Sequence, residues 1–215
     1  MTPTVQTFAV SWPLSGDATS TIGIVGEGEL ARFIATRAFR FGIEVLAGVN
    51  YAGEEWHSLA DVSGGRLRLL TPLEAIRPEI VVLAVPWASV ASTLSLVVDW
   101  EARILVDATT PEEPIGGNGV AAVENSTQLL ASMVQNAYVV KGLNFAPGKF
   151  EMQIGSDFGR RVAFISGDEP RANSEVCRLL GQMGFAAVDL GPLAQGAPLQ
   201  RVPGPLSDCI MMRLD

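Results

Sequence analysis

Apolar and polar positions follow two clear periods between residues 21 and 50. β-Branched residues dominate residues 22–25, which predicts a buried strand. Apolar residues then recur every three or four positions, the period of a helix with one buried face; they are Leu30, Ala31, Ile34, Ala35, Ala38 and Phe41. Gly42 ends the predicted helix, and residues 44–48 have the pattern of a second strand. Strand, helix and strand within about 30 residues form the βαβ unit that binds dinucleotides.

The turn between the first strand and the helix reads Gly26-Glu27-Gly28-Glu29-Leu30. Gly26 permits a tight turn off the strand, and Gly28 lets the backbone come close to a pyrophosphate. The helix that follows would present free N–H groups and a partial positive charge to the phosphates. Glycine turns also join strands to helices in folds that bind no nucleotide. Here the periodic pattern on both sides favours dinucleotide binding over a purely structural turn.

The rest of the chain alternates between runs typical of strands and runs typical of helices. Further strands are expected at residues 66–70, 80–85, 103–106, 137–141, 161–165 and 185–190. Helices are expected at residues 54–61, from Thr71, at 88–100, at 124–135, and at a stretch with Val176, Leu179, Leu180 and Met183 on one face. Thr71, Pro72 and Glu74 have the spacing of a capping box. This alternation predicts an α/β protein of Rossmann type, with a doubly wound parallel sheet and a C-terminal βαβ extension.

Three regions are expected along the chain. Residues 1–20 would form an N-terminal arm, residues 21–142 the dinucleotide-binding Rossmann domain, and residues 143–215 the C-terminal α/β extension. A long connection without a clear period is expected at residues 143–159. Pro203 and Pro205 interrupt the tail and leave at most a short terminal helix from Leu206.

Composition narrows the class of protein. The chain has 215 residues, 48% of them hydrophobic, and can bury a substantial core. Its net charge of −8 argues against nucleic acid or an anionic membrane as partner. No apolar run approaches the about 20 residues that span a bilayer. The two cysteines, Cys177 and Cys209, suggest no disulfide framework, so a cytoplasmic protein is expected. His57, the single histidine, lies in a polar connection and is expected at the surface; no metal site is expected.

Several short segments together resemble a known family. They read GEGELA in the glycine turn, VVLAVPW at residues 81–87, ILVDATTP at 104–111, VVKGLN at 139–144 and GFAAVDLGPL at 184–193. In this order and spacing, residues 21–197 resemble the NADP-binding reductases that exchange hydride with the deazaflavin coenzyme F420. The cytoplasmic domain of the six-transmembrane metalloreductases is similar and belongs to the same group.

The resemblance implies which residues contact the cofactor. Residues 26–30 would hold the pyrophosphate, with Glu29 at a position that is acidic or amide in such proteins. Three further sets are implied: Ala84, Val85 and Pro86 on the adenosine and nicotinamide-ribose side, with Trp87 nearby; Ala108 and Thr109 beside the nicotinamide; and Gly142, Leu143 and Asn144 next to them. Each of these residues could instead have a purely structural role, at a strand end or in a turn.

Two departures from the family stand out. Such proteins usually carry Gly-Ser-Arg after the second strand, where Ser and Arg hold the 2′-phosphate of NADP; here the matching residues are Gly48, Val49 and Asn50. The fork that binds a phosphate bidentately is missing, and no acid stands there to bind the ribose diol of NAD. Glu27 adds negative charge close to the expected phosphates. Discrimination between NADP and NAD is therefore expected to be weak. The interrupted tail is the second departure, and it bears on the acceptor site.

Hydride transfer between a nicotinamide and a flavin-like ring requires little acid–base chemistry from the protein. We therefore expect an oxidoreductase that moves hydride between NAD(P)H and a small redox acceptor, a flavin or deazaflavin, and the resemblance allows a homodimer. A non-catalytic dinucleotide sensor and a small-substrate dehydrogenase or imine reductase are the alternatives. Lys141 would polarise a substrate oxygen in the last case, although a lysine at a strand end more often faces outward. No residue is assigned a catalytic role.

The connection after Leu143 is a second region with two interpretations. Phe145, Phe150 and Met152 could wall an acceptor pocket, or they could simply cover the edge of the sheet.

Overall fold

The computed structural model describes residues 21–111, 126–143, 145, 159–201, 204–206 and 210–214. The expected N-terminal arm and Cys209 lie outside these residues, as do Asn144, Phe150 and Met152. Everything below refers to the described part of the chain.

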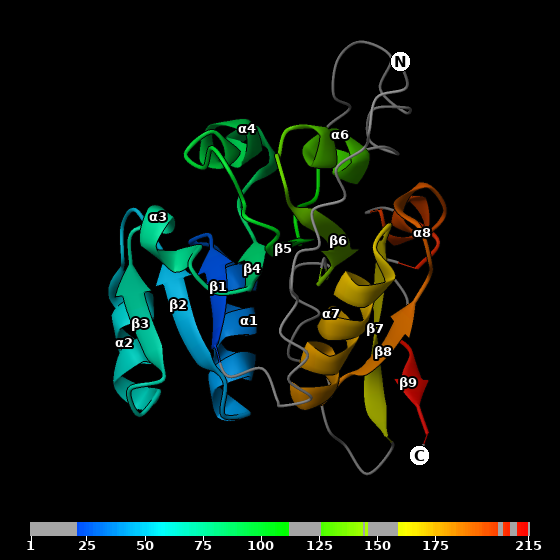
Figure 1. The fold of residues 1–215 in the computed structure, drawn as a ribbon. Helices are drawn as coiled ribbons and strands as arrows, with labels where there is room; N and C mark the ends of the chain where they lie inside the picture. The colour runs from blue at the N-terminus through cyan, green and yellow to red at the C-terminus, as the bar shows by residue number, and fades with distance from the viewer. Residues whose placement is uncertain are drawn as a thin grey trace.

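The described strands form one sheet, in the order β3-β2-β1-β4-β5-β6-β7-β8, with β9 paired to β7 (Figure 1). Their bounds are β1 Thr21–Val25, β2 Glu44–Gly48, β3 Leu67–Leu70, β4 Ile80–Leu83, β5 Ile104–Asp107, β6 Tyr138–Gly142, β7 Arg160–Gly167, β8 Ala186–Asp189 and β9 Met212–Arg213. Strands β1 to β6 run parallel to one another. The predicted α/β fold with a Rossmann-type sheet is confirmed.

Helices cover both faces of this sheet, as a doubly wound fold requires. Their bounds are α1 Glu29–Arg40, α2 Glu54–Val62, α3 Pro72–Ala75, the 3₁₀ turn η1 Trp87–Ser89, α4 Val90–Leu94, α6 Ser126–Ser132, α7 Pro170–Gln182 and α8 Leu193–Gln200. Helices α1, α2 and α7 pack on one face, and α3, α4, α6 and α8 pack on the other. None of the described helices has the length and apolar character needed to cross a membrane.

The strands next to the glycine turn are buried on both faces, because their side chains alternate between two apolar clusters. Ile22 and Ile24 of β1 pack with the α1 and α7 cluster, and Val25 packs with the α3 and α4 cluster. In β4, Ile80 and Val82 share the first cluster, while Val81 and Leu83 share the second. Uninterrupted apolar runs are therefore explained by a central position in a parallel sheet.

In the C-terminal half, the direction of one strand and the presence of one helix differ from the expectation. Strand β7 follows the predicted 161–165 closely, but it runs antiparallel to β6, whereas β8 is parallel to β7. Apolar periodicity indicates a strand without indicating its direction, which depends on the partner it meets. Helix α8 was not foreseen, because Gly196 and Pro198 disfavour a helix. Burial of Leu193 and Ala197 in the core outweighs this local preference.

The stretch at residues 88–100 was expected to be one helix and is not. It begins with η1, continues as α4 and ends at Leu94, after which the chain turns towards Trp100. The capping box at Thr71 is present, with the Glu74 carboxylate accepting hydrogen bonds from the backbone N–H and hydroxyl of Thr71. These bonds lower the pKa of Glu74.

Candidate functional site

The glycine turn lies where the strand order reverses. In the parallel register Val25 pairs with both Gly48 and Leu83, Leu83 pairs with Asp107, and Asp107 pairs with Lys141. The carboxyl ends of five neighbouring strands therefore meet at one edge of the sheet. Ligands of open α/β sheets bind outside such an edge, at the point where the order reverses. All described segments that sequence analysis assigned to the cofactor follow these strand ends.

Gly26 is required by the fold itself. Its φ is +147°, and a Cβ on it would lie 2.2 Å from the carbonyl oxygen of Ala84. Its N–H donates to the Gly48 carbonyl at 3.2 Å. The turn can therefore leave β1 between β2 and β4 only if this residue has no side chain.

Gly28 is different, because nothing in the protein requires a glycine there. It is the N-cap of α1, with a φ of −76° and a ψ of 179° that any residue adopts. A Cβ on it would meet no protein atom within 4 Å. A side chain would instead project into the open space before the α1 N-terminus, where N–H groups and the helix dipole favour an anion. The small residue leaves this space free for a ligand.

Glu27 ties the glycine turn to the loop after β2. Its Oε1 accepts hydrogen bonds from the backbone N–H groups of Asn50 at 2.6 Å and Tyr51 at 3.3 Å. Its carbonyl oxygen accepts from Arg32 Nη1 at 2.8 Å and from Trp56 Nε1 at 3.1 Å. Sequence analysis noted the charge of Glu27 but did not foresee that its side chain reaches the end of β2. A contact across 23 residues leaves no trace in local spacing.

The segments after β4 and β5 differ in exposure. Ala84 is buried, Val85 is half-buried and Pro86 is exposed at the edge of the sheet. Ala108 and Thr109 are 1% and 2% exposed. The Thr109 hydroxyl donates to Asp107 Oδ1 at 2.6 Å, so it is bonded within the protein.

Asp107 and Lys141 form a buried pair beneath this segment. Lys141 Nζ lies 3.3 Å from Asp107 Oδ2 and donates to the Thr109 carbonyl at 2.5 Å. Thr127 donates its hydroxyl to Asp107 Oδ2 at 2.6 Å. Burial lowers the pKa of Lys141, and the carboxylate of Asp107 opposes that shift. The expectation that Lys141 faces outward is therefore wrong: it is 3% exposed, because Asp107 stands directly opposite on β5 and pairs with its charge.

Phe145 is partly buried and packs against the core. Its ring stacks on Phe185 with centroids 5.6 Å apart and meets the edge of Phe33 on α1 at 6.0 Å. The Arg161 guanidinium lies 4.8 Å from its centroid. Of the two interpretations of this residue, the structure favours the one in which it covers the sheet.

The other candidate residues differ in where they lie. His57 is exposed on α2, as predicted. Asn144, assigned to the nicotinamide, is outside the described residues. Val49 is buried and Asn50 is exposed at the end of β2.

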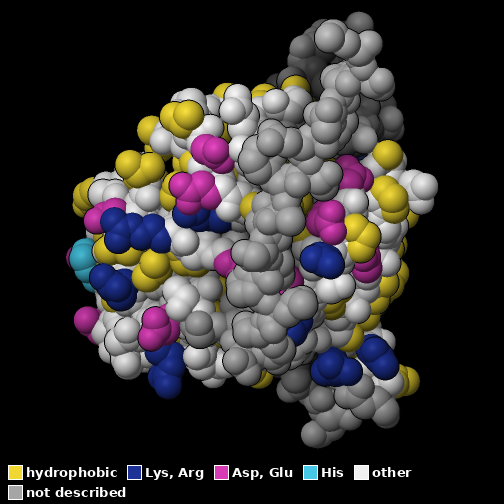
Figure 2. Space-filling model, viewed as in Figure 1, with side chains coloured by type: hydrophobic (Ala, Val, Ile, Leu, Met, Phe, Trp, Pro, Cys, Tyr) yellow, Lys and Arg dark blue, Asp and Glu magenta, His cyan; other side chains and the backbone are white. Residues whose placement is uncertain are grey.

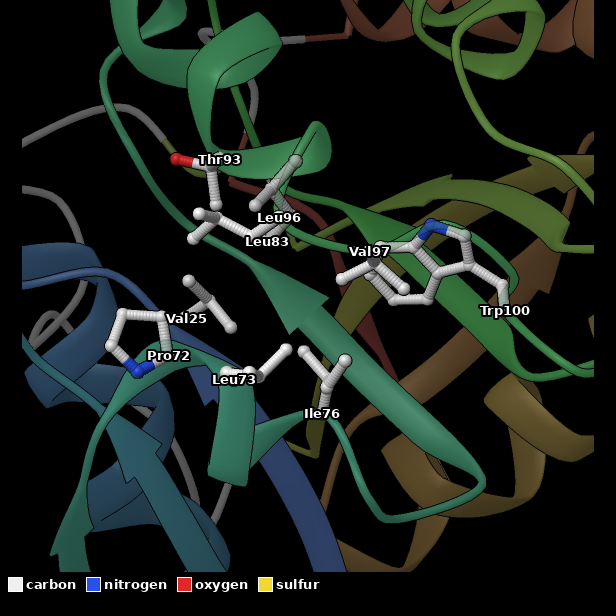
Figure 3. A pocket seen from close by; sticks show the side chains of 9 residues that line it. All are labelled: Val25, Pro72, Leu73, Ile76, Leu83, Thr93, Leu96, Val97 and Trp100. Carbon is white, nitrogen blue, oxygen red and sulfur yellow. The ribbon is translucent and has the colours of Figure 1, made fainter.

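A shallow apolar pocket opens beneath the last residues of β1 and β4, on the α3 and α4 side (Figure 3). Its lining comes from Val25, Pro72, Leu73, Ile76, Leu83, Thr93, Leu96, Val97 and Trp100. The Thr93 hydroxyl, the oxygen in this lining, points away from the other side chains (Figure 3). The indole Nε1 of Trp100 is buried, so the pocket wall is apolar and does not offer the donors that a pyrophosphate requires. On the face shown in Figure 2, basic and acidic side chains are interspersed over the described surface.

Residues 21–111 match the family model described as NADP oxidoreductase, coenzyme F420-dependent. Among curated proteins, Metalloreductase STEAP3 of Rattus norvegicus is 30% identical over 186 residues, which cover 85% of this chain and 36% of that protein. Metalloreductase STEAP2 of Homo sapiens is 24% identical over 190 residues, with the same two shares. The chain thus spans little more than a third of the length of these relatives.

Solved structures agree on the fold. A hypothetical protein from Sinorhizobium meliloti superposes with a TM-score of 0.80 at 29% identity, over 91% of this chain and 96% of that one. A reductive aminase from Aspergillus terreus, in complex with NADPH and ethyl levulinate, has a TM-score of 0.62 at 20% identity, over 87% and 60% of the two chains.

Proposed function

We propose that the chain, whose residues 21–111 match the model of the coenzyme F420-dependent NADP oxidoreductases, binds a nicotinamide dinucleotide and passes its hydride to a small redox acceptor. The acceptor class is a flavin or a deazaflavin. The observation that carries the proposal is the open space at Gly28, before the N-terminus of α1 and at the reversal of the strand order.

The residues at this edge suit each part of such a cofactor. The backbone N–H groups that begin α1 would hold the pyrophosphate, since Gly28 leaves them accessible. The nicotinamide ring would supply the hydride when it is bound. Lys141 and Asp107 hold the segment at Ala108 and Thr109 in place below it. Their work is positioning, which is what hydride transfer demands of the protein.

A substrate dehydrogenase that uses Lys141 as its acid is disfavoured by the same contacts. The Nζ atom is engaged by Asp107 and by the Thr109 carbonyl, and the side chain is buried. Transfer between two cofactor-like rings needs no such acid. A homodimer, which the family resemblance implies, completes the proposal, and light scattering of the purified protein would show twice the chain mass.

Nucleotide titration tests the cofactor half of the proposal. We expect the wild-type protein to bind NADH or NADPH, and Gly28→Val to abolish binding without loss of fold. Gly53→Val is a matched control, because Gly53 is the N-cap of α2 with nearly the same backbone, φ −70° and ψ 174°. Equal binding by the Gly28 variant and the wild type would place the pyrophosphate elsewhere.

Turnover tests the acceptor half. The reduced nucleotide would be offered with a deazaflavin, with FMN and with a ferric chelate, the last because relatives carry the name metalloreductase. Oxidation by the deazaflavin or FMN is expected. Tight binding without oxidation by any acceptor would favour a sensor, and turnover with an imine alone would favour an imine reductase.

A further inference from the structure

We propose that the Glu27 carboxylate selects the adenosine ribose of the cofactor, accepting the hydroxyls of NADH and excluding the 2′-phosphate of NADPH. The inference rests on the proposed binding of a nicotinamide dinucleotide. It assigns to one side chain of the glycine turn a specificity that this fold ordinarily places at the end of β2.

Glu27 fills an anion site made by its own chain. The N–H groups of Asn50 and Tyr51, two successive residues after β2, both point at Glu27 Oε1, at 2.6 Å and 3.3 Å. Successive backbone N–H groups of this kind bind phosphates and other anions. Here a carboxylate occupies that position, so a phosphate could reach these donors only by displacing it.

The position is the one that reads the ribose. In dinucleotide-binding folds, an acid about 20 residues beyond the glycines accepts the ribose 2′-hydroxyl of NAD, and an arginine there accommodates the phosphate of NADP. The residues at the end of β2 are Val49, which is buried, and Asn50, so neither device is present. The carboxylate comes from the turn instead. No described residue donates to Glu27 Oε2, which is left to accept a ribose hydroxyl.

The backbone of Glu27 is held in place before any ligand binds. Arg32 and Trp56 donate to its carbonyl oxygen from α1 and α2 respectively, at 2.8 Å and 3.1 Å. A group fixed in this way recognises its ligand without paying to be ordered on binding. Glu27 therefore presents its carboxylate at a defined place.

Arg32, the cation that contacts the glycine turn, is already engaged by other acceptors. Arg32 Nη1 already donates to the Glu27 carbonyl and lies 3.0 Å from Glu55 Oε2. A 2′-phosphate would thus meet the Glu27 carboxylate without an uncommitted positive partner from these residues. Like charges placed together oppose binding, whereas the neutral diol of NADH can donate to the carboxylate. Charge-assisted contacts of this kind change affinity by about ten- to a hundredfold.

Calorimetric dissociation constants for NADH and NADPH test the inference on the full chain. The wild type should bind NADH at least about tenfold more tightly than NADPH. Glu27→Gln keeps an oxygen for the Asn50 and Tyr51 N–H groups but removes the charge. It should shift the ratio of the two constants towards NADPH by about ten- to a hundredfold. Glu27→Ser, which also vacates the space, should shift it in the same direction.

Glu54→Gln is the matched control, because it removes an exposed carboxylate from the nearby first turn of α2. Its NADH to NADPH ratio should equal that of the wild type, since exposed charges are screened. Thermal unfolding identifies any variant that does not fold, and Glu27→Gln alone suffices if Glu27→Ser fails.

The outcomes separate this inference from the function beneath it. Nucleotide binding with NADPH preferred, or a ratio that Glu27→Gln leaves unchanged, overturns the role of Glu27 and leaves the oxidoreductase proposal standing. Failure of the folded wild type and variants to bind either nucleotide overturns the proposed function, and the inference falls with it.

Discussion

At the scale of single residues, the two glycines of the turn have different roles. Gly26 has a positive φ and would collide with Ala84 if it carried a side chain, so the protein's own packing demands it. Gly28 has an ordinary backbone and open space in front of it, so its lack of a side chain is explained only by the ligand that we propose. The same residue type in one short motif is thus required by the fold at one position and, in our proposal, by the cofactor at the other.

Rebuilding the phosphate site provides a prediction at this scale. Val49→Ser with Asn50→Arg introduces the hydroxyl and guanidinium of the family, but the new guanidinium would pair with the Glu27 carboxylate beside it. The double variant should therefore gain little NADPH affinity. Adding Glu27→Ser should free the guanidinium and raise NADPH affinity by a further ten- to a hundredfold or so.

Fluorescence titration of the double and triple variants measures this difference. Glu54→Gln in place of Glu27→Ser is the control for charge alone. A double variant that already binds NADPH as tightly as the triple variant would show that Glu27 does not oppose the phosphate.

At the scale of elements, β5 and β6 are joined at their ends by a charge as well as by their ladder. Lys141→Met would leave Asp107 buried without its cation, although Thr109 and Thr127 would still donate to it. Breaking one partner of a buried pair costs about 3–5 kcal/mol of unfolding free energy. We expect a loss in this range, measured by urea unfolding.

A double-mutant cycle distinguishes the pair from the packing of the lysine stem. Asp107→Asn with Lys141→Met should cost less than the sum of the two single changes, since no charge is then left alone. Additive costs would mean that the two groups contribute independently.

A second prediction at this scale concerns the packing between α1 and the residue just before β8. Phe145→Ala removes a ring that packs on Phe33 and Phe185. The free energy of unfolding should fall by about 2–3 kcal/mol, less than for a fully buried ring, because Phe145 is partly buried. Turnover per folded molecule should stay constant. Slower hydride transfer with unchanged stability would return Phe145 to the acceptor pocket.

At the scale of the whole molecule, the expected boundary after residue 142 falls at the end of β6, inside a continuous sheet. One apolar cluster includes Ile24 and Ile34 from the first region together with Ile165, Val176 and Leu179 from the second. Backbone hydrogen bonds between β6 and β7 also join the two regions. The C-terminal extension therefore shares its core with residues 21–142.

Truncation provides a prediction at this scale. A chain ending at residue 142 should aggregate or remain partly unfolded, because it exposes the edge of β6 and the apolar surface that α7 covers. A chain ending at residue 201 loses β9, a two-residue strand, and should stay folded. Circular dichroism and size-exclusion chromatography compare them; a monomeric, cooperatively unfolding 1–142 fragment would show independent folding.

The sequence by itself determined most of the strands and helices, and where the glycine turn lies. Side-chain periodicity is a local property, so β1, α1 and β2 follow directly from the spacing of their apolar residues. The capping box at Thr71 and Glu74 is local in the same way. The parallel sheet could be inferred too, because strands that alternate with helices lead to it.

Only the tertiary structure decided how distant residues meet. The antiparallel direction of β7 depends on its partner β6, and α8 forms because the core buries its apolar side chains despite Gly196 and Pro198. Lys141 is buried because the register places Asp107 opposite it. Glu27 reaches the end of β2 because strand pairing brings two loops together that are 23 residues apart. Contacts of this kind depend on distance in space, which local spacing along the chain does not encode.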